Sequence, residues 1–235
     1  SSLEDVQLYS VCRYGKKELE LVKNKFHFKH SSENYKEALS FKEIDGAIIS
    51  TPHTSHYACA KEALNNQLHV IIEKPMTTSS VEAKELFLLS KKNKKQIIVP
   101  YGYNFTHFMD KAREYIADNI IGSIKHIDAS MSSGTLDLFG GEGLIEAKNH
   151  TFQPLPSTWS DPNKAGGYAW GQTSHLLGAI FKLVNHKSTY IVVIEFNNQF
   201  PVWANYEDPE DCIVFRHSAL AILNFASKKG YKLLD

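Results

Sequence analysis

The 235-residue chain has few cysteines and no long apolar run. Its three cysteines, Cys12, Cys59 and Cys212, are far apart and include no Cys-x-x-Cys pair, so they predict buried free thiols rather than disulfides or a zinc ribbon. No stretch approaches the roughly 18 apolar residues of a membrane-spanning helix, and residues 1–7 do not resemble a signal peptide. We therefore expect a cytoplasmic protein without a membrane partner.

The chain also lacks an excess of charge of either sign. Its 26 basic and 26 acidic side chains give a formal net charge of zero, which provides no long-range attraction for nucleic acid. The densest basic run, residues 91–95, is interpreted as the end of a helix. The pairs His27/His30 and His53/His56 have a spacing that can bind a metal, but no cysteine or carboxylate cluster accompanies them, so we expect no metal site.

A turn of the form Gly-x-Gly-x-x-Gly is absent as well. In dinucleotide-binding folds this turn follows the first strand and carries the pyrophosphate on a helix N-terminus. The glycine cluster at residues 140–143 has the wrong spacing and lies too late in the chain, so we interpret it as a loop.

What the chain does contain, from residue 6 to residue 101, is an alternation of short apolar runs and amphipathic segments. This pattern is typical of parallel strands linked by helices in a doubly wound α/β fold. We expect strands at residues 6–12, 47–50, 68–72 and 96–99, and helices at residues 17–25, after residue 32, at residues 56–64 and behind a capping box that begins at Ser79.

The character of the sequence changes after Gly122. Residues 123–131 favour a longer strand, and residues 132–167 are rich in glycine, proline and polar side chains. A second domain with long loops is therefore expected. Its elements are a helix at residues 174–183, a strand at residues 189–196 and a helix at residues 217–228.

The most informative motif is Glu73-Lys74-Pro75, directly behind the apolar run at residues 70–72. Charged residues behind a buried parallel strand lie at the carboxyl end of the sheet, where open α/β folds bind their ligands. The alternative is a solvated ion pair at a strand end. Lys74 is thus a candidate for contact with a small molecule.

Three motifs occur in a fixed order. They are Ser50-Thr51-Pro52-His53 with His56, then His69-Val70 before Glu73-Lys74-Pro75, then Gly166-Gly167 before His175. Together with Tyr103-Asn104 and residues 121–124, they resemble the Gfo/Idh/MocA-type oxidoreductases, which include glucose-fructose oxidoreductase and inositol dehydrogenase. Each motif is weak alone, but their order extends over residues 6–184.

This resemblance implies a Rossmann-type domain over residues 1–120 that binds NAD or NADP. It also implies a C-terminal α/β domain over residues 121–235, whose open, mainly antiparallel sheet carries substrate and subunit contacts. A homo-oligomer, either a dimer or a tetramer, would follow. By comparison with the family, the first βαβ unit is missing from the given chain.

The resemblance further implies hydride transfer between a nicotinamide and a sugar, cyclitol or related polyol. Lys74 would donate or accept the accompanying proton, which requires its pKa to fall by roughly 2 to 3 units through burial and a cationic ring nearby. His175 is the second catalytic candidate. The alternative is a structural histidine of the helix whose ring is hydrogen-bonded within the core. The family usually has an aspartate four residues before this histidine, and here that position is Gly171.

Arg13 stands where the family often has an aspartate that accepts hydrogen bonds from the adenosine ribose. An arginine there favours a 2′-phosphate and hence NADP, whereas the alternative is an exposed basic turn. The expected cofactor contacts are Arg13, Ser50, Thr51, Pro52, His53, His56, Glu73 and Lys74. The expected substrate contacts are Tyr103, Asn104, Trp159, Gln172 and His175.

Two other functions remain open. A relative of these enzymes can use the nicotinamide only transiently, to break a glycosidic bond. Alternatively, the protein binds a nicotinamide as a sensor or assembly subunit and has lost its chemistry along with the aspartate.

Overall fold

The structure is a computed structural model that describes residues 5–124, 126–130, 138, 151–152, 155, 157–165, 169–183 and 191–195. These residues all fall within one compact unit of the chain, residues 1–195. The expected loop at residues 140–143, the glycine pair at residues 166–167, the helix at residues 217–228 and Cys212 lie outside the described residues.

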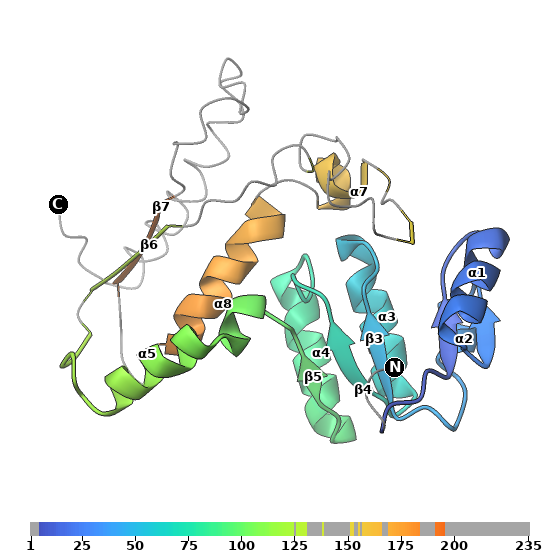
Figure 1. Cartoon of the computed structure of the whole chain (residues 1–235), viewed down its shortest axis with the longest axis horizontal. Coiled ribbons are helices and arrows are strands. Elements are labelled where there is room, and N and C mark those ends of the chain that lie inside the picture. The colour runs from blue at the N-terminus through green and yellow to red at the C-terminus, as the bar shows by residue number, and fades with distance from the viewer. Residues whose placement is uncertain are drawn as a thin grey trace, which may run out of the picture. The chain divides into compact units, whose positions relative to one another are not determined.

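Parallel strands alternate with helices through the first part of the chain (Figure 1). Strands β1 (Ser10–Cys12) and β2 (His30–Ser32) pair in parallel on either side of helix α1 (Lys16–Phe26) in the sequence. Strands β3 (Gly46–Ile49), β4 (His69–Ile72) and β5 (Ile97–Ile98) form a second parallel sheet in that order. Helices α3 (His56–Asn65) and α4 (Ser80–Asn93) connect them. The predicted α/β fold with parallel strands is confirmed.

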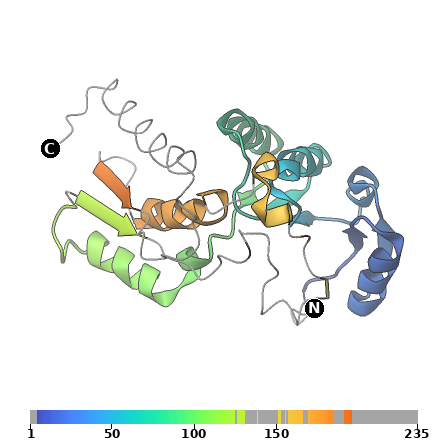
Figure 2. The ribbon, with the colours of Figure 1, turned by 90° about the horizontal axis from the view of Figure 1, so that it is seen from above.

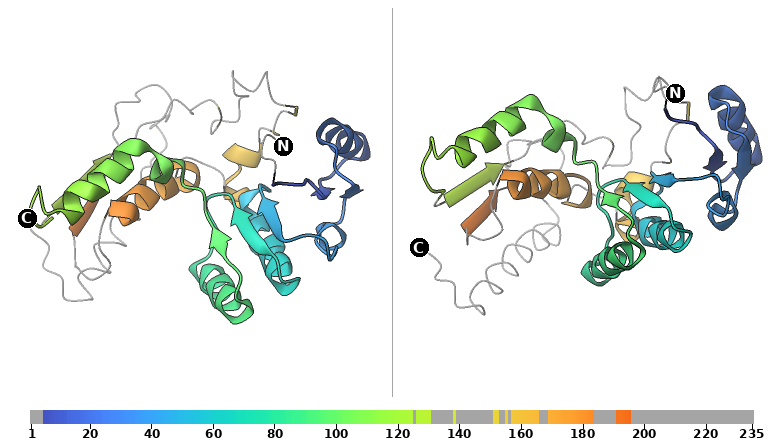
Figure 3. Two further views of the ribbon diagram at one scale, coloured as in Figure 1. Left: turned by 60° about the horizontal axis from the view of Figure 1, so that its bottom comes forward. Right: turned by 90° about the horizontal axis from the view of Figure 1, so that it is seen from below.

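The core lies between the β3–β4–β5 sheet and the two helices on one of its faces (Figure 3). Side chains of β4 alternate, so that Val70 and Ile72 are buried while Ile71 is exposed. The buried pair packs with Leu64 of α3 and Leu86 of α4, both fully inaccessible to solvent. Small residues of α3, among them Ala60 and Ala63, let the helices approach closely.

Strand β2 is one of the elements that the sequence pattern does not predict. Its residues, His30, Ser31 and Ser32, are polar, and the strand is held by pairing with β1 and by aromatic contacts. The His30 ring stacks on Phe41 at 4.2 Å between centroids. The helix expected after residue 32 is only the short α2 (Tyr35–Ala38), which begins where the Asn34 side chain accepts a hydrogen bond from the Lys36 amide.

Helix α4 begins at the predicted position but without the predicted capping box. Ser79 has the extended conformation of an N-cap residue, yet its side chain makes no capping hydrogen bond. Instead the Thr77 hydroxyl donates to the Ser79 carbonyl oxygen at 2.7 Å, which fixes the turn before the helix. At the other end, Lys94 is left-handed with φ 55°, so the basic run does end a helix as predicted.

One thiol is also placed differently from the prediction. Cys59 of α3 is a buried free cysteine, as expected, whereas Cys12 is exposed. Cys12 is the last residue of the short strand β1, which pairs with β2, and its side chain is exposed to solvent. Within the described residues, no helix is long and apolar enough to cross a membrane.

The second part of the described chain contains helices α5 (His107–Ala117) and α8 (Ser174–Leu183) and the strands β6 (His126–Ser130) and β7 (Ile191–Glu195). Helix α8 has the predicted bounds, and α5 is not predicted. Strands β6 and β7 lie side by side near α5 and α8 (Figure 2) and pair in parallel. Helix α8 lies between the two strands in the sequence, and parallel strands are usually connected by a helix of this kind. This described pair is parallel, whereas the family resemblance implies a mainly antiparallel sheet. The sheet as a whole and the domain boundary near residue 120 stay predictions.

The packing of α4 leads to a stability prediction. Leu86→Ala should lower the free energy of unfolding by about 2–5 kcal/mol, because it removes a fully buried side chain and leaves a cavity. Val81→Ala on the same helix, at a side chain that is 74% exposed, should change it by less than about 0.5 kcal/mol. Urea unfolding of both variants makes the comparison. Equal losses would contradict the placement of the core.

Candidate functional site

The carboxyl ends of β3 and β4 bring two of the sequence motifs to one edge of the sheet. Ile49 and Ile72 are paired in register, so Ser50-Thr51-Pro52 and Glu73-Lys74-Pro75 leave the sheet side by side. The Glu73 amide donates to the Ile49 carbonyl oxygen at 2.9 Å. The side chains of Ser50, Thr51, Pro52 and Glu73 are exposed at this edge. A ligand can therefore reach them.

His56, at the start of α3, joins these two segments. Its ring is fully buried, with Nδ1 2.8 Å from the Pro75 carbonyl oxygen and Nε2 2.8 Å from the Thr51 carbonyl oxygen. The bond between Lys74 and Pro75 is cis. Both ring nitrogens thus face main-chain oxygens, and the N–H of the neutral ring donates to one of them. The predicted contact of His56 with a cofactor stays a prediction.

Lys74 turns away from its acidic neighbour. Its half-buried ammonium donates to the Gly171 carbonyl oxygen at 2.6 Å. Among the described residues no ion pair joins it to Glu73, whose carboxylate accepts from the Lys74 amide instead. Burial lowers the pKa of Lys74 below its ordinary 10.5, against a smaller opposing effect of Glu73. The solvated ion pair considered for this strand end is not observed.

Gly171 belongs to a π-helical turn, η5 (Ala169–Thr173), which runs directly into α8. Gln172 is half-buried in the same turn. One helical turn later, His175 lies among tyrosine rings, 6.5 Å from Tyr101 and 5.8 Å from Tyr103 between centroids. Burial lowers the pKa of His175, and the nearby positive charge of Lys74 lowers it further. The structure thus brings Lys74 and His175 into one site.

A third segment reaches the site through His53. This buried histidine has its Nδ1 2.9 Å from the Ala165 carbonyl oxygen, and its ring meets the Trp159 ring edge-on at 5.8 Å. Trp159 lies in the short helix α7 (Ser157–Ser160). Burial lowers the pKa of His53, and the charges of His56 and Lys74 act in the same direction. Residues 157–165 are therefore attached to the strand end that carries Lys74.

Four buried polar atoms in these segments make no hydrogen bond with the described protein. They are Asn104 Oδ1, Trp159 Nε1, Thr173 Oγ1 and His175 Nδ1. Buried polar atoms in proteins almost always have a partner, so each of these four atoms keeps a hydrogen-bonding capacity that the described protein does not use. Within the described residues, no group of three or more His, Cys, Asp or Glu side chains could hold a metal ion.

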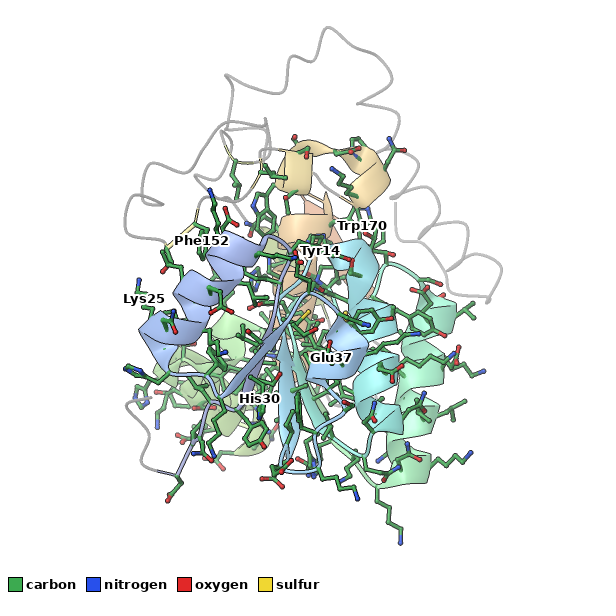
Figure 4. The ribbon with its side chains drawn as sticks, turned by 90° about the vertical axis from the view of Figure 1, so that its right-hand side faces the viewer. Tyr14, Lys25, His30, Glu37, Phe152 and Trp170 are labelled. Atoms are coloured by element: carbon green, nitrogen blue, oxygen red, sulfur yellow. The ribbon has the colours of Figure 1, made fainter. Side chains whose placement is uncertain are left out.

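Arg13 directly follows β1 in the sequence. It therefore adjoins the two-stranded sheet and not the sheet of β3, β4 and β5. Its Nε donates to the Tyr14 carbonyl oxygen at 3.2 Å, and its guanidinium carbon lies 3.8 Å from the centre of the Phe152 ring. Tyr14 is 85% exposed, and Figure 4 shows it and Phe152 close to α1. The sequence pattern does not predict the contact with Phe152.

Tyr101 also lies near His175, and no sequence motif predicts it. A Cβ atom added to Gly178 would lie 2.7 Å from the Tyr101 ring, so the glycine lets α8 lie directly on this ring. The only signal in the sequence is a glycine inside an apolar helix, which often marks a close approach. Burial raises the pKa of Tyr101 above 10.0, which keeps its hydroxyl neutral.

Residues 1–101 match the family model described as an oxidoreductase family with an NAD-binding Rossmann fold. Over these residues the chain is similar to the Gfo/Idh/MocA oxidoreductase family. The resemblance that the ordered motifs predict is confirmed.

Individual relatives agree with this family. The uncharacterized oxidoreductase YfiI of Bacillus subtilis is 32% identical over 111 residues, or 47% of this chain and 28% of the relative. The uncharacterized oxidoreductase C26H5.09c of Schizosaccharomyces pombe is 27% identical over 200 residues, or 85% of this chain and 47% of the relative. The chain therefore spans less than half the length of each of these relatives.

Among solved structures, levoglucosan dehydrogenase in complex with NADH and levoglucosan superposes with a TM-score of 0.60 at 18% identity. The match covers 75% of this chain and 45% of that chain. At this identity the likeness concerns the fold, and it supports a Rossmann-type domain followed by further α/β structure.

The buried histidine at residue 53 predicts a specific pH dependence. Its pKa in the folded protein lies below the ordinary 6.5, so the unfolded chain binds the proton more readily. The stabilisation by the neutral ring is present above about pH 6.5 and is lost as the pH falls toward the folded-state pKa. Between pH 6.5 and 5.5, the free energy of unfolding of the parent protein should fall by up to about 1.4 kcal/mol more than that of His53→Gln. Urea unfolding at several pH values, with pH 8 as the reference, tests this. Parallel pH curves would contradict it.

Proposed function

We propose that the protein is an NAD(P)-dependent oxidoreductase that transfers a hydride between a nicotinamide cofactor and a sugar, cyclitol or related polyol. The observation that carries this proposal is the half-buried Lys74 amine at the carboxyl ends of the strands, next to His175. The similarity of residues 1–101 to a family with an NAD-binding Rossmann fold supports a nicotinamide cofactor. The activity of the whole protein, its substrate and its partners are part of the proposal.

The residues at the strand ends fit a bound nicotinamide nucleotide. Ser50, Thr51, Pro52 and Glu73 are exposed along the edge where open α/β sheets bind such ligands, and His53 lies directly behind them. When bound there, the nicotinamide would supply the carbon that accepts or gives the hydride. The chain itself has to bind the substrate, exclude water and move one proton.

Lys74 is the proposed proton carrier. For alcohol oxidation a neutral amine must accept the hydroxyl proton, and for carbonyl reduction an ammonium must donate one. Burial favours the neutral amine by lowering the pKa of Lys74, which suits a base that works nearer to neutral pH. His175 is proposed to orient the same hydroxyl or to relay its proton, because its Nδ1 is buried and has no hydrogen-bond partner in the described protein.

The proposed substrate class follows from the buried polar atoms that have no hydrogen-bond partner in the described protein. Trp159 Nε1 can only donate, Asn104 Oδ1 can only accept, and the Thr173 hydroxyl can do both. A polyhydroxylated ring offers matching donors and acceptors on several carbons. Tyr103, whose ring meets that of His175 edge-on, and Gln172, in η5, are proposed as further contacts. The superposed neighbour binds levoglucosan, a small cyclic sugar derivative, which agrees with this class.

For the cofactor we propose NADP in preference to NAD. Arg13 stands behind the first described strand, where its guanidinium can bind a 2′-phosphate, and its stacking on Phe152 restricts its orientation. We further propose a cytoplasmic homo-oligomer with a nucleotide domain over residues 1–120 and a substrate and oligomerisation domain over residues 121–235. These points extend the resemblance to the family.

Replacing the proposed proton carrier tests the central point. Lys74→Met should lower kcat for polyol oxidation by about 10²- to 10⁴-fold, because the proton carrier is removed. Nicotinamide binding should change by no more than a few-fold, because methionine keeps most of the length of the side chain. In the parent protein, kcat/KM for oxidation should rise with pH through a midpoint below 10.5. Lys84→Met, at an exposed position of α4, is the matched control.

The outcomes of this experiment separate the possible functions. Unchanged turnover in Lys74→Met would reject the role of the lysine. Saturable nicotinamide binding without turnover on any sugar, cyclitol or polyol would favour a sensor or assembly subunit. Release of two sugar fragments from a glycoside without net reduced cofactor would favour transient oxidation.

The cofactor preference has its own test. Arg13→Asp should weaken NADPH binding by about 1–3 kcal/mol more than NADH binding, because a charge-assisted hydrogen bond to the 2′-phosphate is lost. Lys92→Asp changes the charge equally at the carboxyl end of α4, which lies away from the carboxyl ends of the strands. Fluorescence titration with both nucleotides measures the difference. Equal losses for NADPH and NADH would reject the proposed role of Arg13.

A further inference from the structure

The partner of the Lys74 ammonium is a main-chain atom. The Gly171 carbonyl oxygen accepts its hydrogen bond at 2.6 Å, although the two residues are 97 positions apart in the chain. Glu73, the acidic neighbour, is exposed and forms no ion pair with Lys74 in the described part of the chain. The ammonium is therefore oriented by a neutral dipole.

The local backbone explains why a carbonyl oxygen is available at this place. In η5 the hydrogen bonds run from residue i to i+5, and in α8 they run from i to i+4. Where a π-helical turn runs into an α-helix, such a change of pattern frees carbonyl groups for other donors. The Trp170 carbonyl oxygen accepts from the Ser174 hydroxyl at 3.4 Å, and the next carbonyl oxygen along the chain is the one bound to Lys74.

We propose that the π-helical turn η5 makes residue 171 a positioning residue for Lys74, which holds the amine through a main-chain oxygen in the place of a carboxylate. Glycine is suited to this position because residue 171 is buried and contributes no side chain beside the amine. Residue 171 does not touch the reacting atoms and acts only through Lys74.

The choice of a neutral partner has a chemical consequence. A carboxylate next to an amine stabilises the ammonium form and raises the pKa of the amine, whereas a carbonyl dipole does so much less. With a carbonyl partner the effect of burial on Lys74 is retained, and the amine loses its proton at a lower pH. The protein thereby gains a base that works at a lower pH than a carboxylate-paired lysine would.

The hydrogen bond itself can be tested without any turnover. In protein labelled with ¹³C at glycine carbonyl carbons, the Gly171 resonance should move when Lys74 is changed to Met and should stay in place in Lys84→Met. In the parent protein the same resonance should titrate with the Lys74 amine. A Gly171 resonance that is indifferent to Lys74→Met overturns the proposal.

The second test changes the charge at residue 171. Lysine amines are dimethylated with ¹³C-formaldehyde, and the Lys74 signal is assigned by its loss in Lys74→Arg. Gly171→Asp should raise the titration midpoint of this signal by about one pH unit or more relative to Gly171→Asn, which has the same size without the charge. Identical midpoints in the two variants overturn the proposal.

Turnover forms a separate readout that rests on the proposed function. In Gly171→Asp the pH profile of kcat/KM for oxidation should shift upward together with the midpoint of Lys74, and in Gly171→Asn it should stay near that of the parent. If the carbon resonances respond as expected in a protein without turnover, the positioning role is supported and the proposed enzyme activity is rejected. If the titration midpoint of Lys74 shifts and the pH profile of kcat/KM does not, Lys74 is rejected as the proton carrier.

Discussion

The arrangement of the site depends on the contacts of one buried imidazole ring. His56 lies between the Thr51 and Pro75 carbonyl oxygens, at 2.8 Å from each, and so joins the segments that leave β3 and β4. The neutral ring has one N–H and donates it to one of these carbonyl oxygens; without the ring that carbonyl group would lose this partner, which costs about 1–3 kcal/mol. Because Lys74 directly precedes Pro75, the ring also determines where the amine enters the site. The position of the reactive group is thus set by the first turn of α3.

Three basic side chains lie near these strand ends, and their surroundings disfavour the charged form of each. Burial lowers the pKa values of His53, Lys74 and His175, and the positive charge of Lys74 adds to the effect on both histidines. The exposed Glu73 only partly opposes this effect, because its carboxylate faces solvent. A site of this kind favours neutral bases over ammonium and imidazolium ions, which suits the removal of a proton from a substrate hydroxyl.

The sequence predicts the elements that have a local signal. The apolar runs become β3, β4 and β5, and α8 has the predicted bounds, because burial of a continuous apolar segment dominates the local preference. Strand β2 has no such signal, since its polar residues are held by pairing and by the ring of Phe41. The contact between Lys74 and Gly171 could not be predicted either. A carbonyl oxygen is present at every residue, so its use at one position depends on the tertiary fold.

The helix that carries His175 nevertheless contains a pattern that connects sequence and site. Gly171, His175 and Gly178 are separated by four and three residues, which places them on one side of a helix. In the structure the first meets Lys74, the second lies among tyrosine rings, and the third lies against Tyr101. The two glycines are needed for different reasons: one keeps a side chain away from the amine, and the other allows the helix to lie on an aromatic ring. The missing acidic side chain at residue 171 is therefore part of how this helix approaches the strand ends, and a carboxylate introduced there would have to fit a buried position.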